Sequence, residues 1–243
     1  MENHPKVSVI IPARNEETMI GRALESIQNG GVPAHEVIVV INGTTDSTAE
    51  IARKMYAKVI CFEKALGYSG ARNEGASRAS GNILVFMDAD SLMGPNVLLA
   101  ITQSSAEPKV FGTVLGGADN AKIRYKIFFL IKNTAHRLGF YRGVLGGLFF
   151  CETELFKSAG GYDNSLAINE NADIVQHLLK RGGKYKLLTN VFAYTSMRRF
   201  EEHGMWRALL FWCMVKLRWF IKSKRSKIGN QYAMTHDKFY SSR

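Results

Sequence analysis

The stretch ILVFMDAD, residues 83–90, decides the fold class more clearly than any other part of the chain. Its five consecutive apolar residues predict a strand buried on both faces, because a half-exposed strand would alternate apolar and polar residues. Asp88 and Asp90 follow at once. The sequence therefore predicts two carboxylates at the carboxyl end of a buried strand, where ligands bind in open α/β sheets.

Strand and helix patterns alternate upstream of this stretch. The predicted strands cover residues 7–11, 37–41 and 59–62. Three helices are predicted between and after them: one over residues 18–26, one that begins at residue 47, and one over residues 69–79. Ser47 and Glu50 have the spacing of a capping box at the second of these helices. Alternation of this kind predicts an α/β fold with a Rossmann-like, mostly parallel sheet flanked by helices on both faces.

The pattern is looser after Pro95. We expect strands at residues 110–115, 144–150, 185–188 and 191–195, and helices at 96–105, 122–138 and 169–181. A last helix over 205–221 is strongly apolar and also carries basic residues. These patterns predict a main domain over residues 1–200, followed by a C-terminal amphipathic basic helix and tail over 201–243.

Composition limits the classes of function. The 243 residues carry a formal charge of +11, which attracts phosphate groups without selecting their source. Three widely separated cysteines predict reduced thiols and neither a disulfide framework nor a zinc site. The chain has no apolar run of the roughly 18 residues that a membrane span needs and no signal-peptide pattern. We therefore expect a cytoplasmic protein.

Polar residues follow each of the first, second and fourth strands. Asp88 and Asp90 are two apart, so in extended chain both can approach one cation, and an all-oxygen site suits Mg²⁺ or Mn²⁺ bound to a diphosphate. An acidic turn that caps the next helix is the alternative. Arg14 can meet a phosphate and Glu16 a ribose hydroxyl, while Asn42 can contact a base edge. Capping alone explains much of this pattern, including Asp46.

The segment GYSGARNEG, residues 67–75, opens the third helix. Glycines and free backbone amides at a helix start favour an anion, and Arg72 adds a positive charge. A flexible loop before a surface helix is the alternative. Four such segments are predicted to meet at one sheet edge, and this convergence is stronger support for a ligand site than any one of them.

In this order the segments resemble those of the family 2 glycosyltransferases, which are inverting enzymes with the GT-A fold. The similarity runs through residues 7–16, 42–48, 71–73 and 88–90, continues through GGYD at 160–163, and ends with ENAD at 170–173. The resemblance implies a nucleoside-diphosphate sugar as donor and a divalent metal held by Asp88 and Asp90, with Asp90 the surer ligand. It also implies a set of nucleotide-sugar contacts: Pro12, Ala13, Arg14, Glu16, Asn42, Asp46, Arg72, Asn73, Asp88 and Ala89.

Two positions depart from the family pattern. Ile41 and Asn42 stand where two adjacent aspartates are usual, which leaves the base of the donor open. Asn171 stands where the family has its general base, and an amide cannot accept a proton at neutral pH. Glu170 and Asp173 are the neighbouring carboxylates that can take this catalytic role. A phosphate acceptor, which is already ionised, would need no base.

The expected function is transfer of a sugar from this donor to an acceptor. Tryptophan and basic residues in 205–221, followed by the basic cluster at 222–227, fit a membrane surface. A lipid-linked acceptor, such as a polyprenyl-linked one, is therefore a hypothesis, with the protein peripheral on the inner face of the membrane. Packing of that helix on the domain or in a dimer is the alternative.

Two other classes of function stay open. One is a nucleotidyltransferase, and the other is a non-catalytic binder, either a sugar-nucleotide-binding pseudoenzyme or a basic nucleic-acid module. No stacking platform or reader motif for nucleic acid stands out in the sequence, so a nucleic-acid partner is not expected.

Overall fold

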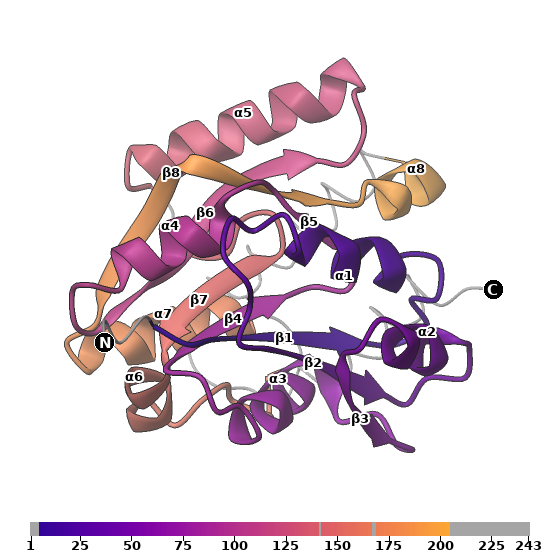
Figure 1. Cartoon of the computed structure of the whole chain (residues 1–243). Coiled ribbons are helices and arrows are strands. Elements are labelled where there is room, and N and C mark those ends of the chain that lie inside the picture. The colour runs from indigo at the N-terminus through magenta and orange to yellow at the C-terminus, as the bar shows by residue number, and fades with distance from the viewer. Residues whose placement is uncertain (1–4, 141, 167–168, 205–243) are drawn as a thin grey trace.

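The computed structural model describes residues 5–140, 142–166 and 169–204, and it confirms the predicted α/β class (Figure 1). The helix expected over 205–221, and nearly all of the predicted C-terminal unit 201–243, lie outside the described residues. None of the helices in the described part combines the length and the apolarity that crossing a bilayer requires.

In the described part of the chain, the strands form one eight-stranded sheet in the order β3-β2-β1-β4-β7-β6-β8-β5. The strands are β1 (Val7–Ala13), β2 (Glu36–Asn42), β3 (Lys58–Phe62), β4 (Ile83–Met87), β5 (Ser91–Met93), β6 (Val110–Ala118), β7 (Leu148–Glu152) and β8 (Lys184–Thr195). The four strands β1 to β4 are parallel, and so are β6 and β8. Only β7 and β5 run antiparallel to their neighbours in this sheet, so it is mostly parallel, as expected.

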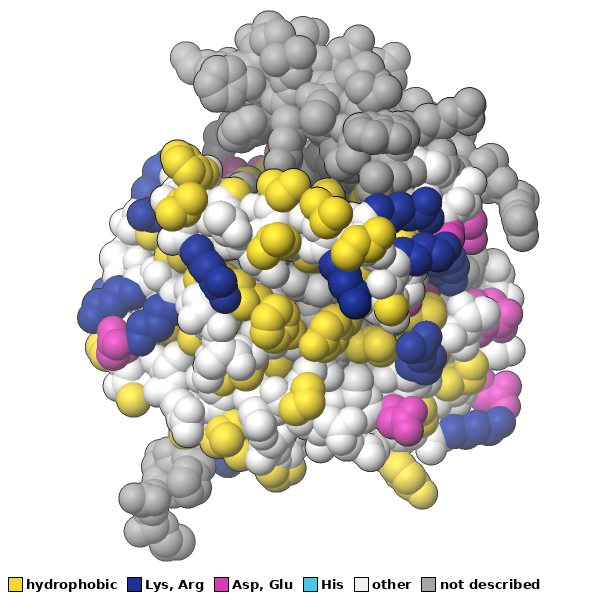
Figure 2. All heavy atoms as spheres, turned by 90° about the horizontal axis from the view of Figure 1, so that it is seen from above, with side chains coloured by type: hydrophobic (Ala, Val, Ile, Leu, Met, Phe, Trp, Pro, Cys, Tyr) yellow, Lys and Arg dark blue, Asp and Glu magenta, His cyan; other side chains and the backbone are white. Residues whose placement is uncertain are grey.

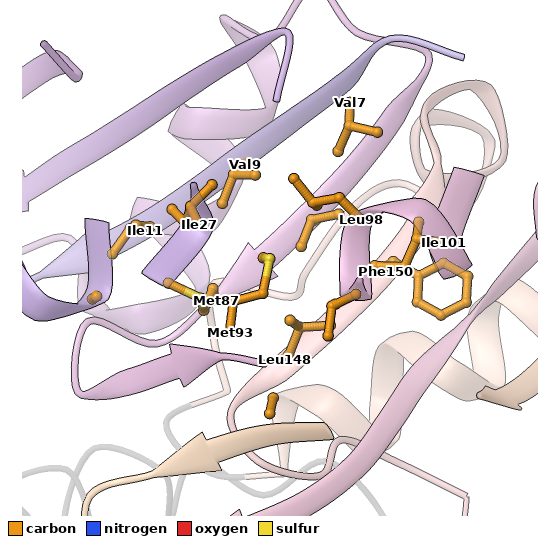
Figure 3. Close-up of a cluster of buried hydrophobic side chains, with 14 of the residues drawn as sticks. Val7, Val9, Ile11, Ile27, Met87, Met93, Leu98, Ile101, Leu148 and Phe150 are labelled. Atoms are coloured by element: carbon orange, nitrogen blue, oxygen red, sulfur yellow. The ribbon is translucent and has the colours of Figure 1, made fainter. Parts of the chain in front are cut away.

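Helices cover both faces of the sheet. One face packs against α1 (Ile20–Ile27), α2 (Thr48–Lys54) and α4 (Val97–Ser104). The other packs against α3 (Gly67–Ser77), α6 (Thr153–Ser158) and α7 (Glu170–Lys180). Figure 3 shows the first cluster, in which the odd-numbered residues of β1 and β4 meet the helices. The remaining helices are α5 (Ile123–Arg137), which packs along β6, and α8 (Arg198–His203).

This two-sided packing fixes where the chain points when it leaves β4. Leu84 and Phe86 face the layer that contains α3 and α7. Because side chains alternate along a strand, Asp88 continues on the same side as Leu84 and Phe86. The first predicted carboxylate is therefore aimed at the two helices that carry Arg72 and Glu170.

Several local predictions were wrong. The two strands expected at 185–188 and 191–195 are one strand, β8, whose register against β6 shifts between Val114 and Leu115. The strand expected at 144–150 begins only at Leu148, because Gly146 and Gly147 have φ of 58° and 68° and form a turn. The capping box is also wrong, since the side chain of Ser47 makes no cap hydrogen bond.

Candidate active site

Arg72 is the centre of the candidate site. It lies on α3 and only 7% of its side chain is exposed. Its Nη2 donates to Asp88 Oδ1 at 2.9 Å, and its Nη1 donates to Glu170 Oε1 at 3.0 Å. The guanidinium carbon also lies 5.3 Å from the ring centroid of Tyr162. One buried cation thus joins the end of β4 to the start of α7.

The electrostatics of this cluster keep Arg72 charged. Burial opposes the charge, but Asp88, Tyr162 and Glu170 together raise the pKa of Arg72 above its ordinary value. Burial also raises the pKa of Tyr162, so its hydroxyl stays protonated and donates to Asn171 Oδ1 at 3.3 Å. Arg72 is therefore a permanent cation that holds the carboxylates of Asp88 and Glu170 in place.

The two carboxylates predicted as catalytic occupy different surroundings. Glu170 begins α7, and its Oε1 accepts hydrogen bonds from both Arg72 and the side-chain amide of Asn171, the latter at 3.1 Å. Asp173 lies one turn later, where its Oδ2 is buried and 3.7 Å from His177 Nδ1. The structure therefore brings Glu170, but not Asp173, into the cluster around Arg72.

The two carboxylates predicted as metal ligands follow β4 as expected. Asp88 has a side chain 40% exposed, whereas Asp90 is 9% exposed and Ala89 is buried between them. The backbone N–H of Asp88 donates to the carbonyl of Gly147 at 2.9 Å. A Cβ at Gly147 would lie 3.0 Å from Asp88 Oδ2 and 2.2 Å from Ser91 Oγ, so this position requires glycine.

At the end of β1, Glu16 has a partner that the sequence did not indicate. Its carboxylate is 9% exposed and accepts a hydrogen bond from Arg198 Nη2 at 2.9 Å. Pro12 and Ala13 are buried at the same strand end, and Arg14 is exposed beside them. No local sequence pattern could pair positions 182 apart.

At the end of β2, two predicted nucleotide contacts make hydrogen bonds within the protein. The Oδ1 of Asn42 accepts from the Leu66 N–H at 2.6 Å, and its Nδ2 donates to the Gly67 carbonyl at 3.2 Å. Asp46 accepts from the Thr48 N–H at 3.0 Å and from the Glu17 N–H at 3.1 Å. Burial opposes its ionisation, but these bonds and one from the Thr48 hydroxyl hold the pKa of Asp46 below its usual range.

Asn73 is likewise bonded within the protein. Its Oδ1 accepts from the Tyr162 N–H at 2.9 Å, and its Nδ2 donates to the Tyr162 carbonyl at 2.8 Å. This pair of bonds fixes the turn at residues 160–163 on α3 and presents the Tyr162 ring to Arg72. Contacts of Asn42, Asp46 and Asn73 with a nucleotide stay predictions, and each of these residues also stabilises a loop at the site.

The site as a whole is one sheet edge that gathers the ends of β1, β2 and β4 and the starts of α3 and α7. It combines a buried cation, buried and half-buried carboxylates, and backbone turns held by amide side chains. Residues 8–153, more than half of the chain, match the family described as glycosyl transferase family 2. The chain belongs to this family.

Among curated relatives, 4,4'-diaponeurosporenoate glycosyltransferase from Staphylococcus aureus strain bovine RF122 / ET3-1 is 43% identical over 93 residues. The match covers 36% of this chain and 24% of that protein, so this member of family 2 matches about a quarter of the length of the relative. The same protein from strain USA300 matches to the same extent.

Solved structures agree on the fold. A mannosyltransferase of Pyrobaculum calidifontis in complex with GDP-Man and Mn²⁺ has a TM-score of 0.67 at 20% identity, covering 98% of this chain and 70% of that one. Residues 1–349 of S. aureus TarS give a TM-score of 0.63 at 20% identity, covering 80% of this chain and 61% of that one. Together with the family, these likenesses establish the GT-A fold.

The carboxylates fit a metal that is shared with a substrate. In the described part of the chain, no group of three or more His, Cys, Asp and Glu side chains could hold an ion. Sites for Mg²⁺ that involve phosphate substrates commonly use only one or two carboxylates and complete the shell with phosphate oxygens and water. Asp88 and Asp90 supply this smaller set at the end of β4.

Proposed function

We propose that this family 2 member is an inverting, metal-dependent glycosyltransferase that moves a hexosyl group from a nucleoside-diphosphate sugar to an acceptor. The observation that carries the proposal is the Arg72 cluster at the carboxyl edge of the sheet. It places a permanent cation between Asp88, a proposed metal ligand, and Glu170, a proposed proton acceptor, so the groups that a metal, a diphosphate and an acceptor hydroxyl would need lie in one cluster.

The donor would lie across the ends of β1, β2 and β4. Arg14 and Arg72 are the cations that would face its phosphates, and Glu16 would face the ribose. Mn²⁺ or Mg²⁺ would be held by Asp90 and Asp88 and would neutralise charge on the diphosphate as it leaves. Relatives in the GT-A fold were crystallised with Mn²⁺ and a nucleotide or sugar nucleotide, which supports a divalent metal here.

The transfer would be a single displacement. The oxygen of an acceptor hydroxyl attacks the anomeric carbon from the face opposite the diphosphate. The bond from that carbon to the diphosphate oxygen breaks, and its electron pair stays on the diphosphate. The hydroxyl proton passes to a carboxylate. We assign this proton to Glu170, because both of its described hydrogen bonds fall on Oε1 and leave Oε2 for the acceptor.

Asp173 is the second candidate for the proton acceptor. Asp173 lies one turn after Glu170 on α7 and outside the Arg72 cluster. For Asp173 to take the proton, the acceptor hydroxyl would have to bind beside this second turn of the helix. With hydroxyl acceptors, Glu170→Gln should abolish turnover and Asp173→Asn should retain it. The opposite result would assign the proton to Asp173. Full activity of both variants would indicate an acceptor that is already ionised, such as a phosphate.

For the acceptor, we propose a lipid-linked molecule, such as a polyprenyl-linked one, and a cytoplasmic protein peripheral on the inner membrane face. The relative named for diaponeurosporenoate supports an acceptor other than a free sugar, although its match covers only a short segment. The basic and apolar sequence at 205–227 gives further support, and it lies outside the described residues.

The test is a thermal-shift panel of nucleoside diphosphates and sugar nucleotides, each with and without Mn²⁺. We expect at least one sugar nucleotide to raise Tm only when Mn²⁺ is present, and Asp90→Asn to lose this rise. No metal-dependent shift with any donor would refute the proposal. Donor binding without slow release of free sugar would indicate a pseudoenzyme, and release of sugar phosphate would indicate a nucleotidyltransferase.

A further inference from the structure

The helix α5 buries both apolar and polar side chains and exposes a set of large apolar ones. Its buried side carries Tyr125, Phe129, Asn133 and His136. Two of these are polar and make hydrogen bonds inside the protein: Asn133 bonds both the N–H and the carbonyl of Gly116, and the ring Nε2 of His136 bonds the Tyr185 hydroxyl. A helix on the surface of a globular protein normally has its apolar stripe inward.

The outward side of α5 is apolar. Its exposed large side chains recur at helical spacing and continue past the end of the helix: Ile123 at 71%, Ile127 at 49%, Leu130 at 64%, Ile131 at 64%, Leu138 at 66% and Phe140 at 82%. They account for most of the large hydrophobic side chains exposed in the described part of the chain. A contiguous apolar patch of this kind on an otherwise polar surface marks an interaction site.

Cations flank this patch. The helix contains Arg124, Lys126, Lys132 and Arg137 and no Asp or Glu. In Figure 2, yellow apolar side chains and dark blue cations alternate over this upper face, and the acidic side chains gather toward one edge of it. An occupant of the patch must therefore be apolar where it meets the stripe and anionic around it.

This charge pattern selects among the possible occupants. A second copy of the same face would bring two sets of cations together. The C-terminal segment 205–243 contains nine Lys or Arg and one Asp, so it would also meet cations with cations. A bilayer with anionic head groups offers both an apolar interior and negative charge, so it matches the stripe and the cations together.

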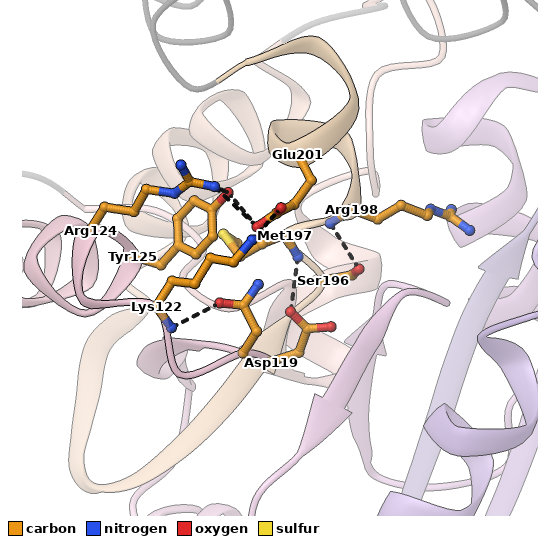
Figure 4. Close-up of polar contacts among 9 residues, drawn as sticks. Asp119, Lys122, Arg124, Tyr125, Ser196, Met197, Arg198 and Glu201 are labelled. Atoms are coloured by element: carbon orange, nitrogen blue, oxygen red, sulfur yellow. Dashed lines mark hydrogen bonds and ion pairs between the residues drawn. The ribbon is translucent and has the colours of Figure 1, made fainter.

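A short helix links this face to the candidate active site (Figure 4). The carboxylate of Glu201 on α8 accepts hydrogen bonds from Lys122 and Arg124 at the start of α5. On the same helix, Arg198 donates to Glu16 at the end of β1. Two successive ion pairs thus connect the outer helix to the sheet edge where the donor would bind.

We propose that the outward face of α5 is the surface by which the protein docks on an anionic membrane, with the stripe in the head-group region and the cations on the lipid charges. Because α8 connects α5 to the sheet edge proposed to bind the donor, docking here would hold that edge at a fixed height above the bilayer. The proposal adds a contact surface to the function proposed above and does not depend on sugar transfer.

The test is co-sedimentation of the full chain with vesicles of phosphatidylcholine mixed with phosphatidylglycerol, and with vesicles of phosphatidylcholine alone. One variant replaces Ile127, Leu130 and Ile131 by Ser, and a second replaces Lys126 and Arg137 by Gln. Because every one of these side chains is exposed, both variants should fold. Near-ultraviolet circular dichroism, and the rise in Tm that a sugar nucleotide causes in the presence of Mn²⁺, check that both variants fold.

We expect the parent to bind the mixed vesicles and to bind the neutral ones roughly tenfold more weakly. Each α5 variant should partition roughly tenfold or more below the parent. Matched changes elsewhere should leave partitioning within about twofold, because single exposed groups away from the docking face contribute little. These controls are Tyr56→Ser, at a side chain 98% exposed, and Arg22→Gln with Lys54→Gln on α1 and α2.

Three results would overturn the proposal. If the α5 variants bind like the parent, another segment carries membrane binding. If neutral and anionic vesicles bind equally, the cations have no part in it. If light scattering after size exclusion shows that the parent is a dimer and the α5 variants are monomers, the face seats a second copy instead. The Mn²⁺-dependent rise in Tm with a sugar nucleotide is measured separately. If the parent shows no such rise, the result counts against the proposed function and not against the docking surface.

Discussion

Replacing Arg72 by Met would test whether the buried cation holds the site together. In the variant, the carboxylates of Asp88 and Glu170 would lose the guanidinium that donates to them at 2.9 and 3.0 Å. Methionine fills much of the same volume, so packing is largely conserved and the loss reports mainly on charge. Removing one partner of a buried ion pair typically costs about 3–5 kcal/mol, because the other partner is left without compensation.

The two carboxylates should not contribute equally. Glu170 has a side chain 17% exposed, so its hydrogen-bonded pair with Arg72 should be worth about 1.5–3 kcal/mol. Asp88 has a side chain 40% exposed, and solvent screening should reduce its pair to under about 1 kcal/mol. We therefore expect Arg72→Met to lower the free energy of unfolding by about 2–4 kcal/mol in total.

Double-mutant cycles in urea separate the two contributions. One cycle combines Arg72→Met with Glu170→Gln and the other combines it with Asp88→Asn. The coupling energy should be larger in the first cycle by at least about 1 kcal/mol. Equal couplings, or a coupling to Glu170 below about 0.5 kcal/mol, would show that burial does not set the strength of these pairs and would refute the reasoning.

Three further predictions follow from single positions. Gly147→Ala should destabilise the fold by about 2–4 kcal/mol and weaken donor binding, because the added methyl group meets Ser91 and Asp88. Gly139 also has a positive φ but has open space around it, so Gly139→Ala should cost only about 1–2 kcal/mol. Equal losses of stability in urea would contradict the close contact at Gly147. Although burial opposes ionisation, hydrogen bonds from two serines lower the pKa of Glu36 from 4.5 to about 2. Its contribution is therefore present above pH 4.5 and lost as pH falls toward 2, so Glu36→Gln should destabilise by roughly 2–3 kcal/mol at neutral pH and by progressively less in acid; a pH-independent loss would contradict this. Asp46→Ala should cost about 1 kcal/mol by removing the acceptor for the Thr48 N–H, the first amide of α2, and an unchanged urea midpoint would argue against that role.

The sequence was sufficient to predict the fold class, most of the elements before Pro95 and the sheet edge at which the candidate site residues lie. Five apolar residues followed by Asp88 and Asp90 predict a buried strand that delivers carboxylates to its carboxyl end, and β4 does so. Local patterns of this kind depend on neighbours within a few positions. Such patterns can predict the direction of a strand, the spacing of buried residues on a helix and the sheet edge at which polar residues lie.

The partners of the site residues could not be predicted in the same way. Arg72 and Glu170 are 98 positions apart, and Glu16 and Arg198 are 182 apart. Asn42 looks like a ligand contact because an amide can bind a base edge, and the family resemblance implies such a contact for Asn73, yet the hydrogen bonds of both close loops. Whether a polar side chain faces a ligand or its own backbone depends on tertiary packing, about which residue spacing carries no information.

The buried pairing of α3 with α7 has a consequence for chimeric enzymes. The family match ends at residue 153, which offers a cut point for joining this chain to a relative. Arg72 and Asn73 lie before that cut, while Glu170 and the turn at 160–163 lie after it. A graft that joins the first half to the second half of a relative must supply a carboxylate and a backbone turn at these two places. Otherwise the buried Arg72 keeps only the half-exposed Asp88 as a carboxylate partner and Asn73 loses the backbone turn that it bonds, so the two halves are exchangeable only as a matched set.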